Sequence, residues 1–158
     1  MATWGDLERE EPEFATLVRG LLDAHVHKVL ATLRRDGAPR ISGIEVTIEA
    51  GDLWTGSMAG SRKTDDLRRD PRFALHSGSE DPPAWRGDAK LSGTMEEVAD
   101  AERWGPKMRE AMGAVPTGGS VFRAELADVV VVRLNAAGDR LVIEHWRPGA
   151  GITRVERA

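Results

Sequence analysis

Short apolar runs separated by turn residues place the strongest constraint on the fold of this chain. Residues 28–34 and 39–48 have the composition of strands, and Arg35-Asp36-Gly37-Ala38 between them favours a hairpin turn. Ala50-Gly51-Asp52 then forms a second turn into a strand at 53–56. The pattern predicts an antiparallel meander.

The rest of the chain continues mainly in strands. Further strands are predicted at 73–77, 88–98, 121–126, 129–134 and 140–146, a loop at 113–119, and helices at 11–24, 62–70 and 100–112, the last interrupted at Gly105-Pro106. Strands and helices do not alternate regularly, which argues against a doubly wound parallel sheet. We therefore expect a mainly β fold with flanking helices, in the form of a closed antiparallel barrel.

Size and composition indicate one ordinary globular domain. The 158 residues fit a single domain, with an N-terminal helix in 1–24 and the barrel in 25–158. No apolar run is long enough to span a bilayer, and the acidic start of the chain lacks the pattern of a signal peptide. We expect a cytoplasmic protein that does not bind membranes.

Composition also excludes several kinds of site. The chain has no cysteine, which excludes disulfides, thiolate nucleophiles and cysteine-based zinc sites. A pI of about 5.6 and few aromatic residues argue against nucleic-acid binding. His25 and His27 have no nearby carboxylate pattern that would complete a metal site, and none is expected.

Four consecutive valines, Val129 to Val132, interrupt the alternation that a half-exposed strand would show. Such a strand is typically covered on both faces. A second subunit or the helices of the same chain could provide the second cover, and we favour a homodimer.

The segment 53–71 has the pattern of a phosphate site. It reads as a short strand, a loop of small residues and a helix that begins after Ser61, a good N-cap, and ends before Pro71. Arg62 and Lys63 fall in the first turn, and residues 61–72 hold five cations against three carboxylates. A helix N-terminus with such cations favours a phosphate, although an ordinary capped surface helix explains the same pattern.

The order of motifs along the chain resembles the pyridoxamine 5'-phosphate oxidase-like split-barrel flavoproteins. Gly60-Ser61-Arg62-Lys63 with 67–75 is similar to the phosphate segment of that family, and 31–40 to its opening hairpin. Residues 87–94 are similar to its fifth-strand region and 144–149 to its terminal element. The resemblance covers roughly residues 25–155 and consists of individually weak motifs in the right order.

This resemblance implies a homodimer with two FMN sites at the subunit interface, and it assigns roles to individual residues. Ser61, Arg62 and Lys63 would bind the cofactor phosphate, with Arg40 as a further phosphate ligand. The strand Arg40-Ile41-Ser42-Gly43-Ile44-Glu45 would run beside the flavin ring. Trp54 and Thr55 would contact the flavin, and Trp146 would line the far side of the ring from the partner subunit. The implied activity is hydride transfer to or from a small organic substrate, for which the flavin supplies the chemistry and no catalytic dyad is required.

Several departures argue against pyridoxamine phosphate as the substrate. The chain has no tyrosine, Glu45 stands where the family often has lysine, and the C-terminal segment lacks the family's substrate-phosphate motif. Two alternatives to an FMN-dependent oxidoreductase remain open. One is a reductase that uses the deazaflavin coenzyme F-420, whose acidic tail would need a basic groove of arginines such as Arg68, Arg69, Arg72 or Arg40. The other is a non-catalytic protein that holds a flavin or haem.

Overall fold

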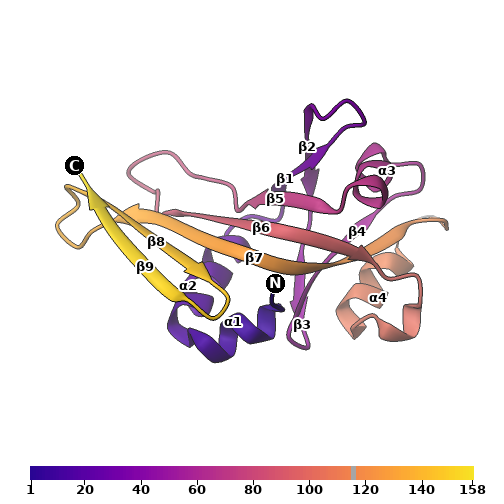
Figure 1. The fold of residues 1–158 in the computed structure, drawn as a ribbon, viewed down its shortest axis with the longest axis horizontal. Coiled ribbons are helices and arrows are strands. Elements are labelled where there is room, and N and C mark those ends of the chain that lie inside the picture. Colours follow the sequence, from indigo (N-terminus) through magenta and orange to yellow (C-terminus); the bar gives the residue numbers. More distant parts are fainter. Residues whose placement is uncertain (115–116) are drawn as a thin grey trace.

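The computed structural model describes residues 1–114 and 117–158 and places its strands in one antiparallel sheet (Figure 1). The strands are β1 (Lys28–Leu33), β2 (Pro39–Ile44), β3 (Thr47–Glu49), β4 (Asp52–Ser57), β5 (Arg72–His76), β6 (Asp88–Glu97), β7 (Ser120–Leu134), β8 (Leu141–Arg147) and β9 (Gly151–Arg157). The helices are α1 (Trp4–Glu10), α2 (Pro12–Asp23), α3 (Arg62–Arg69), the short 3-10 helix η1 (Ala101–Arg103) and α4 (Pro106–Gly113). The strand order is β2-β1-β5-β6-β7-β4-β3, and β8 with β9 forms a hairpin that pairs with β7.

Most predicted elements are confirmed, and the differences have local causes. The predicted strand 39–48 is divided into β2 and β3, because the carbonyl of Glu45 accepts a hydrogen bond from Thr55 Oγ1 at the break. The predicted strands 121–126 and 129–134 are one strand, β7. Gly105-Pro106 does interrupt the predicted helix 100–112, which becomes η1 and α4. Residues 115–116 of the predicted loop lie outside the described residues.

Two elements were not expected from the sequence. Helix α1 is fixed by a capping box, in which Thr3 Oγ1 accepts from the Asp6 amide and the Asp6 carboxylate accepts from the Thr3 amide. Strand β9 pairs along its whole length with β8, so the C-terminal residues extend the sheet.

A bulge between β6 and β7 bends the long central ladder. The register shifts between Ser92 and Gly93, and a Cβ added to Gly93 would lie 1.9 Å from the carbonyl oxygen of Glu125. Only glycine allows the two backbones to approach this closely.

The main core lies between the sheet and helices α1 and α2. Trp4 and Leu7 from α1 and Val18 and Leu22 from α2 are fully buried against strand residues such as Leu91. A second, smaller cluster forms under η1 and α4 from Trp54, Val98, Met108 and Val121, with Trp104 and Met112 packed against it. In the described part of the chain, no helix is long and apolar enough to cross a membrane.

The valine run alternates in burial within the single chain. Val129 and Val131 are fully buried in the main core, whereas Val130 and Val132 on the opposite face are only partly covered. The helices therefore do not provide the expected second cover, and the homodimer stays a prediction.

Helix α3 follows β4 and precedes β5 in the chain, and it contacts β1. It lies at the end of the barrel away from α1 and α2 (Figure 1). At the same end β2 approaches β4 without pairing with it. This split in the barrel wall positions the cations of α3 beside the ends of β2 and β4.

Candidate functional site

The N-terminus of α3 has backbone amides without partners. Ser61 occupies the N-cap position with an extended backbone, but its side chain makes no capping hydrogen bond, which corrects the expected role of its hydroxyl. Instead Ser61 Oγ lies 3.2 Å from Lys63 Nζ. The amides of Arg62 and Lys63 have no hydrogen-bond partner among the described residues, so they remain free to bind an anion.

Arg62 and Lys63 differ from the neighbouring cations in having no ion pair within the described residues. Arg68, by contrast, binds the Glu97 carboxylate through Nε at 2.7 Å and Nη2 at 2.6 Å. Arg72 binds Asp70 in the same two-pronged way. Burial lowers the pKa of Lys63 below its ordinary 10.5, because the charged ammonium loses water without gaining a carboxylate. Both cations are therefore available to a ligand.

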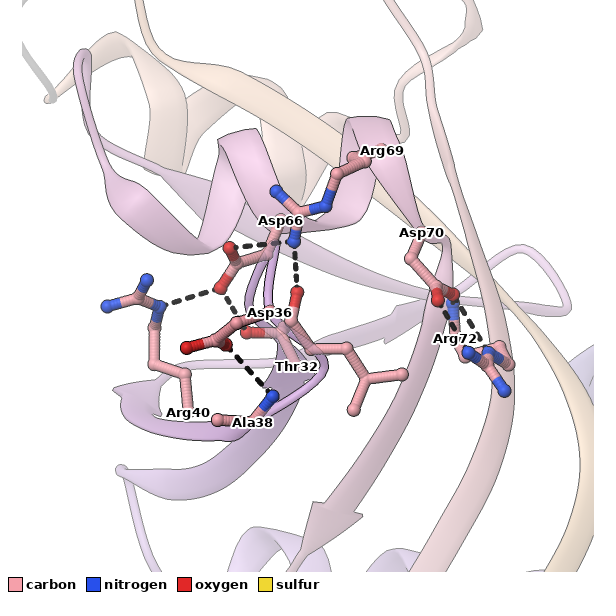
Figure 2. A network of polar contacts seen from close by, with 9 residues as sticks. Thr32, Asp36, Ala38, Arg40, Asp66, Arg69, Asp70 and Arg72 are labelled. Atoms are coloured by element: carbon pink, nitrogen blue, oxygen red, sulfur yellow. Dashed lines mark hydrogen bonds and ion pairs between the residues drawn. The ribbon is translucent and has the colours of Figure 1, made fainter.

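Asp66 is the centre of a buried polar network that joins α3 to the first hairpin (Figure 2). Its carboxylate is 4% exposed and accepts from Thr32 Oγ1 at 2.9 Å, from Arg40 Nε at 2.6 Å and from Arg69 Nη2 at 3.2 Å. Arg69 also donates to the carbonyl of Leu33. Burial raises the pKa of this carboxyl, but hydrogen bonds from Arg40, Thr32 and Arg69 outweigh burial and lower it below 3.8.

The outer side of this network opens into an arginine-lined cavity of about 520 Å³. We call it cavity A. Its lining residues are Arg35, Arg40, Arg62, Asp65, Asp66, Arg68 and Arg69. Because five guanidinium groups face two carboxylates, cavity A favours anions.

A second cavity of about 300 Å³, cavity B, includes Lys63 from the first turn of α3. It is lined by His27, Gly43, Ile44, Glu45, Thr47, Gly56, Ser57, Met58, Lys63, Met108, Ala111 and Met112. Its walls combine the open ends of β2 and β4 with three methionines, and Lys63 supplies a cation. This mixture suits a flat, largely apolar group with a nearby anionic end.

The structure brings some of the expected ligands to these cavities. Arg40 and Arg62 line cavity A, and Gly43 and Lys63 line cavity B. Ile41 lies on the exposed outer side of β2, 74% accessible, and Ser42 is half-buried. These last two residues line neither cavity.

The other expected ring contacts are placed differently. The side chain of Trp54 is part of the second core cluster, and its indole nitrogen is buried without a partner among the described residues. Thr55 is buried and bonded to the Glu45 carbonyl. Neither side chain reaches cavity A or cavity B.

Trp146, which was expected to line the site of a partner subunit, lies in the core and not at the surface of the single chain. Its side chain is fully buried in the main core of its own chain, and its indole N–H donates to Glu10 of α1 at 3.1 Å. Helix α1, which was not predicted, supplies this acceptor and closes the core over the ring.

Sequence reasoning missed Asp66 and the methionines of α4. In the sequence Asp66 is one of three carboxylates in a charged segment, and its burial follows from the contact of α3 with β1. Met108 and Met112 carry no sequence signal for a site, because apolar residues at this spacing are typical of packing.

Comparison with known proteins gives a consistent family. None of the curated protein sequences matches the chain. A pyridoxamine 5'-phosphate oxidase-related, FMN-binding protein from Nostoc punctiforme has a similar structure, with a TM-score of 0.64, 12% identity and coverage of 94% of this chain and 96% of that one. PhzG from Burkholderia lata, in complex with tetrahydrophenazine-1-carboxylic acid, gives a TM-score of 0.63 at 14% identity, with 95% of each chain covered.

A haem-binding protein from Mycobacterium smegmatis is also similar, with a TM-score of 0.55, 16% identity and coverage of 87% of this chain and 55% of that one. At these identities the likenesses establish the fold, which is the expected split barrel with flanking helices. The family profile for pyridoxamine 5'-phosphate oxidase matches residues 15–142, which include β1 to β7, α3 and both cavities. The chain therefore belongs to the pyridoxamine 5'-phosphate oxidase-like family.

Proposed function

We propose that this protein binds FMN and is a flavin-dependent oxidoreductase. The observation that carries the proposal is the N-terminus of α3, where, within residues 1–114 and 117–158, Arg62 and Lys63 have no ion pair and their two backbone amides have no partner. A phosphate group at this point would receive both backbone donors and both charges. The residues present therefore fit the phosphate end of a flavin mononucleotide.

Cavity B suits the ring of the same ligand. It adjoins Lys63, and Gly43 in its wall leaves open space, since nothing lies within 4 Å of a Cβ added there. Met108 and Met112 offer flexible, polarizable contacts to an aromatic system. The ring would lie between the end of β2 and helix α4, with its phosphate at α3.

In a complex with FMN, the cofactor and the protein chain would have separate roles. A bound flavin supplies hydride transfer at its N5 atom, and the chain binds, orients and shields it. Glu45 and His27 both line cavity B, and His27 Nε2 lies 3.6 Å from the Glu45 carboxylate. The substrate is a small organic molecule other than pyridoxamine phosphate, because a carboxylate here would repel a second phosphate.

The outer face of the sheet supports a homodimer. Val29 and Ile41 are exposed on this face and share it with Val130 on β7, with His76 and Lys90 between Val29 and Val130 in the strand registers. Val132, Ile143 and Val155 continue the same face toward the C-terminal hairpin. A second copy of the chain would cover these apolar residues and the polar residues between them, and would bring the open end of β2 close to the interface.

One observation favours coenzyme F-420 as a second candidate. Cavity A is larger than one phosphate requires and carries Arg35, Arg68 and Arg69 in addition to the ligands proposed above. An acidic tail could bind Arg35 and could share Arg68 and Arg69 with their carboxylate partners Glu97 and Asp66, whereas FMN would not reach these arginines.

The experiment that tests the proposal offers both cofactors to the same protein. Purified protein is stripped of small molecules, mixed separately with FMN and with F-420, desalted and analysed by visible spectroscopy and mass spectrometry of the released chromophore. We expect FMN to be retained in about one equivalent per chain. Retention of F-420 alone selects the second candidate, and retention of neither overturns the proposal.

The redox part of the proposal has its own test. The retained flavin should be reduced by NAD(P)H or reoxidised with an organic acceptor at a rate above that of free FMN. A flavin that is bound but never turned over indicates a non-catalytic binding protein.

A further inference from the structure

The buried carboxylate of Asp66 accepts a hydrogen bond from Arg40, which lines cavity A. Asp66 can therefore influence a ligand there without contacting it. We propose that Asp66 is a positioning residue, which fixes the guanidinium of Arg40 so that it presents its outer N–H groups to an anionic ligand in cavity A. This inference rests on the proposed function, because the ligand is taken to be the phosphate end of FMN.

The hydrogen bond between Arg40 and Asp66 uses only one edge of the Arg40 guanidinium. Arg40 donates Nε–H to Asp66 Oδ2 over 2.6 Å, and Figure 2 shows its other two nitrogens pointing away from the carboxylate. Those nitrogens carry four of the five guanidinium N–H donors. Since Arg40 lines cavity A, the bound guanidinium keeps a forked face toward that cavity.

Asp66 can act as a fixed support because its own position is determined from two sides. It belongs to α3, and Thr32 Oγ1 on β1 donates to the same carboxylate oxygen as Arg40. The residue is 3% exposed, so water does not compete freely for the carboxylate. An arginine held this way loses less conformational entropy when an anion binds.

The negative charge of Asp66, considered alone, predicts that its removal strengthens anion binding. A carboxylate beside Arg40 and Arg69 cancels part of their positive charge, so its removal should strengthen the binding of any anion in cavity A. Positioning predicts that removal weakens binding, because Arg40 then moves freely. The sign of the change therefore separates the two roles.

The test compares Asp66→Asn with Asp65→Asn. Asp65 lines the same cavity but bonds to none of its arginine side chains in the described part of the chain, so Asp65→Asn removes an equal charge without releasing Arg40. We expect Asp66→Asn to raise the Kd for FMN by about tenfold and Asp65→Asn to leave it unchanged or lower it by about twofold. Both values come from equilibrium titration of flavin fluorescence, and thermal unfolding confirms that each variant is folded.

A double-mutant cycle shows whether Asp66 acts through Arg40. In the Arg40→Ala background, Asp66→Asn should no longer weaken FMN binding, whereas a general loosening of α3 would weaken it in both backgrounds. If Asp66→Asn does not fold, Thr32→Val replaces it in the cycle, because that change removes one support of the carboxylate and keeps its charge. We expect Thr32→Val to raise the Kd by about threefold, again only when Arg40 is present.

The outcomes distinguish this inference from the proposed function. Wild-type protein that does not bind FMN overturns both. Wild-type binding with an unchanged or lower Kd in Asp66→Asn, or with equal effects in the two backgrounds, overturns the positioning role of Asp66 alone.

Discussion

Arg62 and Lys63 are neighbours in the first turn of α3, yet Arg62 lines cavity A and Lys63 lines cavity B. The first helical turn therefore offers a cation to each cavity beside two amides that have no partner in the described part of the chain. A ligand whose phosphate lies at this point, at the edge of cavity A, can extend its organic part into cavity B.

Truncating either cation should weaken FMN binding. We expect Arg62→Ala and Lys63→Ala each to raise the Kd by about tenfold, because each removes one charge-assisted hydrogen bond to the phosphate. Arg72→Ala is the matched control, since Arg72 bonds to Asp70 and lines neither cavity. Isothermal titration measures all three, and equal losses in the control and the test variants would contradict the assignment.

The pKa of Lys63 should rise when the ligand binds. Burial lowers this pKa in the free protein, and a phosphate dianion close to Nζ would favour the charged form again. The measurement is a pH titration of ¹³C-methylated lysines by NMR with and without FMN, with Lys63→Arg to assign the resonance. An unchanged Lys63 titration in the saturated complex would place the phosphate elsewhere.

Asp66 should make stability depend on pH in the acid range. Its pKa in the folded state lies below 3.8, so the unfolded chain binds more protons there, and the stability that Asp66 contributes is present above about pH 4 and lost as pH falls through the folded pKa. Urea unfolding of wild type and Asp66→Asn between pH 3 and pH 7 checks this. The difference in unfolding free energy should shrink toward pH 3, and a constant difference would contradict the network.

Trp146 should act as a core residue of its own subunit. Trp146→Phe removes the hydrogen bond to Glu10 and part of a fully buried ring, so we expect a loss of about 1–3 kcal/mol in unfolding free energy. FMN affinity at a temperature where the variant is folded should stay within about twofold of wild type, because the ring lines neither cavity. A large loss of affinity with unchanged stability would restore the expected role in a partner's site.

The outer sheet face should govern self-association. Ile41 is 74% exposed in the single chain, so Ile41→Glu leaves the monomer fold intact and places a charge in the proposed interface. We expect light scattering to show a dimer for wild type and a monomer for Ile41→Glu at equal concentration. Val26→Glu, at an exposed residue outside the strands, serves as control and should remain dimeric.

Much of the barrel could be predicted because its signals are local. Gly37 and Gly51 have positive φ angles at the turns that joined the predicted strands, and Pro106 does begin α4 after the expected break. Helix α1 escaped prediction because it is short and depends on the Thr3 and Asp6 capping box. Strand β9 is mostly exposed and polar, so its pairing with β8 has little apolar signature.

Only the part of the candidate site that lies within one helical turn could be predicted from the sequence. The first turn of α3 placed Arg62 and Lys63 correctly relative to the free amides, since helix geometry over a few residues determines this. The pairing of Arg40 with Asp66 joins residues 26 positions apart and depends on how α3 packs on the first hairpin. Trp54 and Trp146 were assigned to the ligand because a strand pattern alone cannot say which face the core covers.

The most direct test of the central claim compares FMN with riboflavin, which has the same ring and no phosphate. If the α3 N-terminus holds the phosphate, wild type should bind FMN at least about a hundredfold more tightly than riboflavin, since two charge-assisted contacts and two amides are lost. In the Arg62→Ala, Lys63→Ala double variant this ratio should fall to within about tenfold, with riboflavin affinity little changed. Equal affinities for FMN and riboflavin in the wild-type protein would contradict the account.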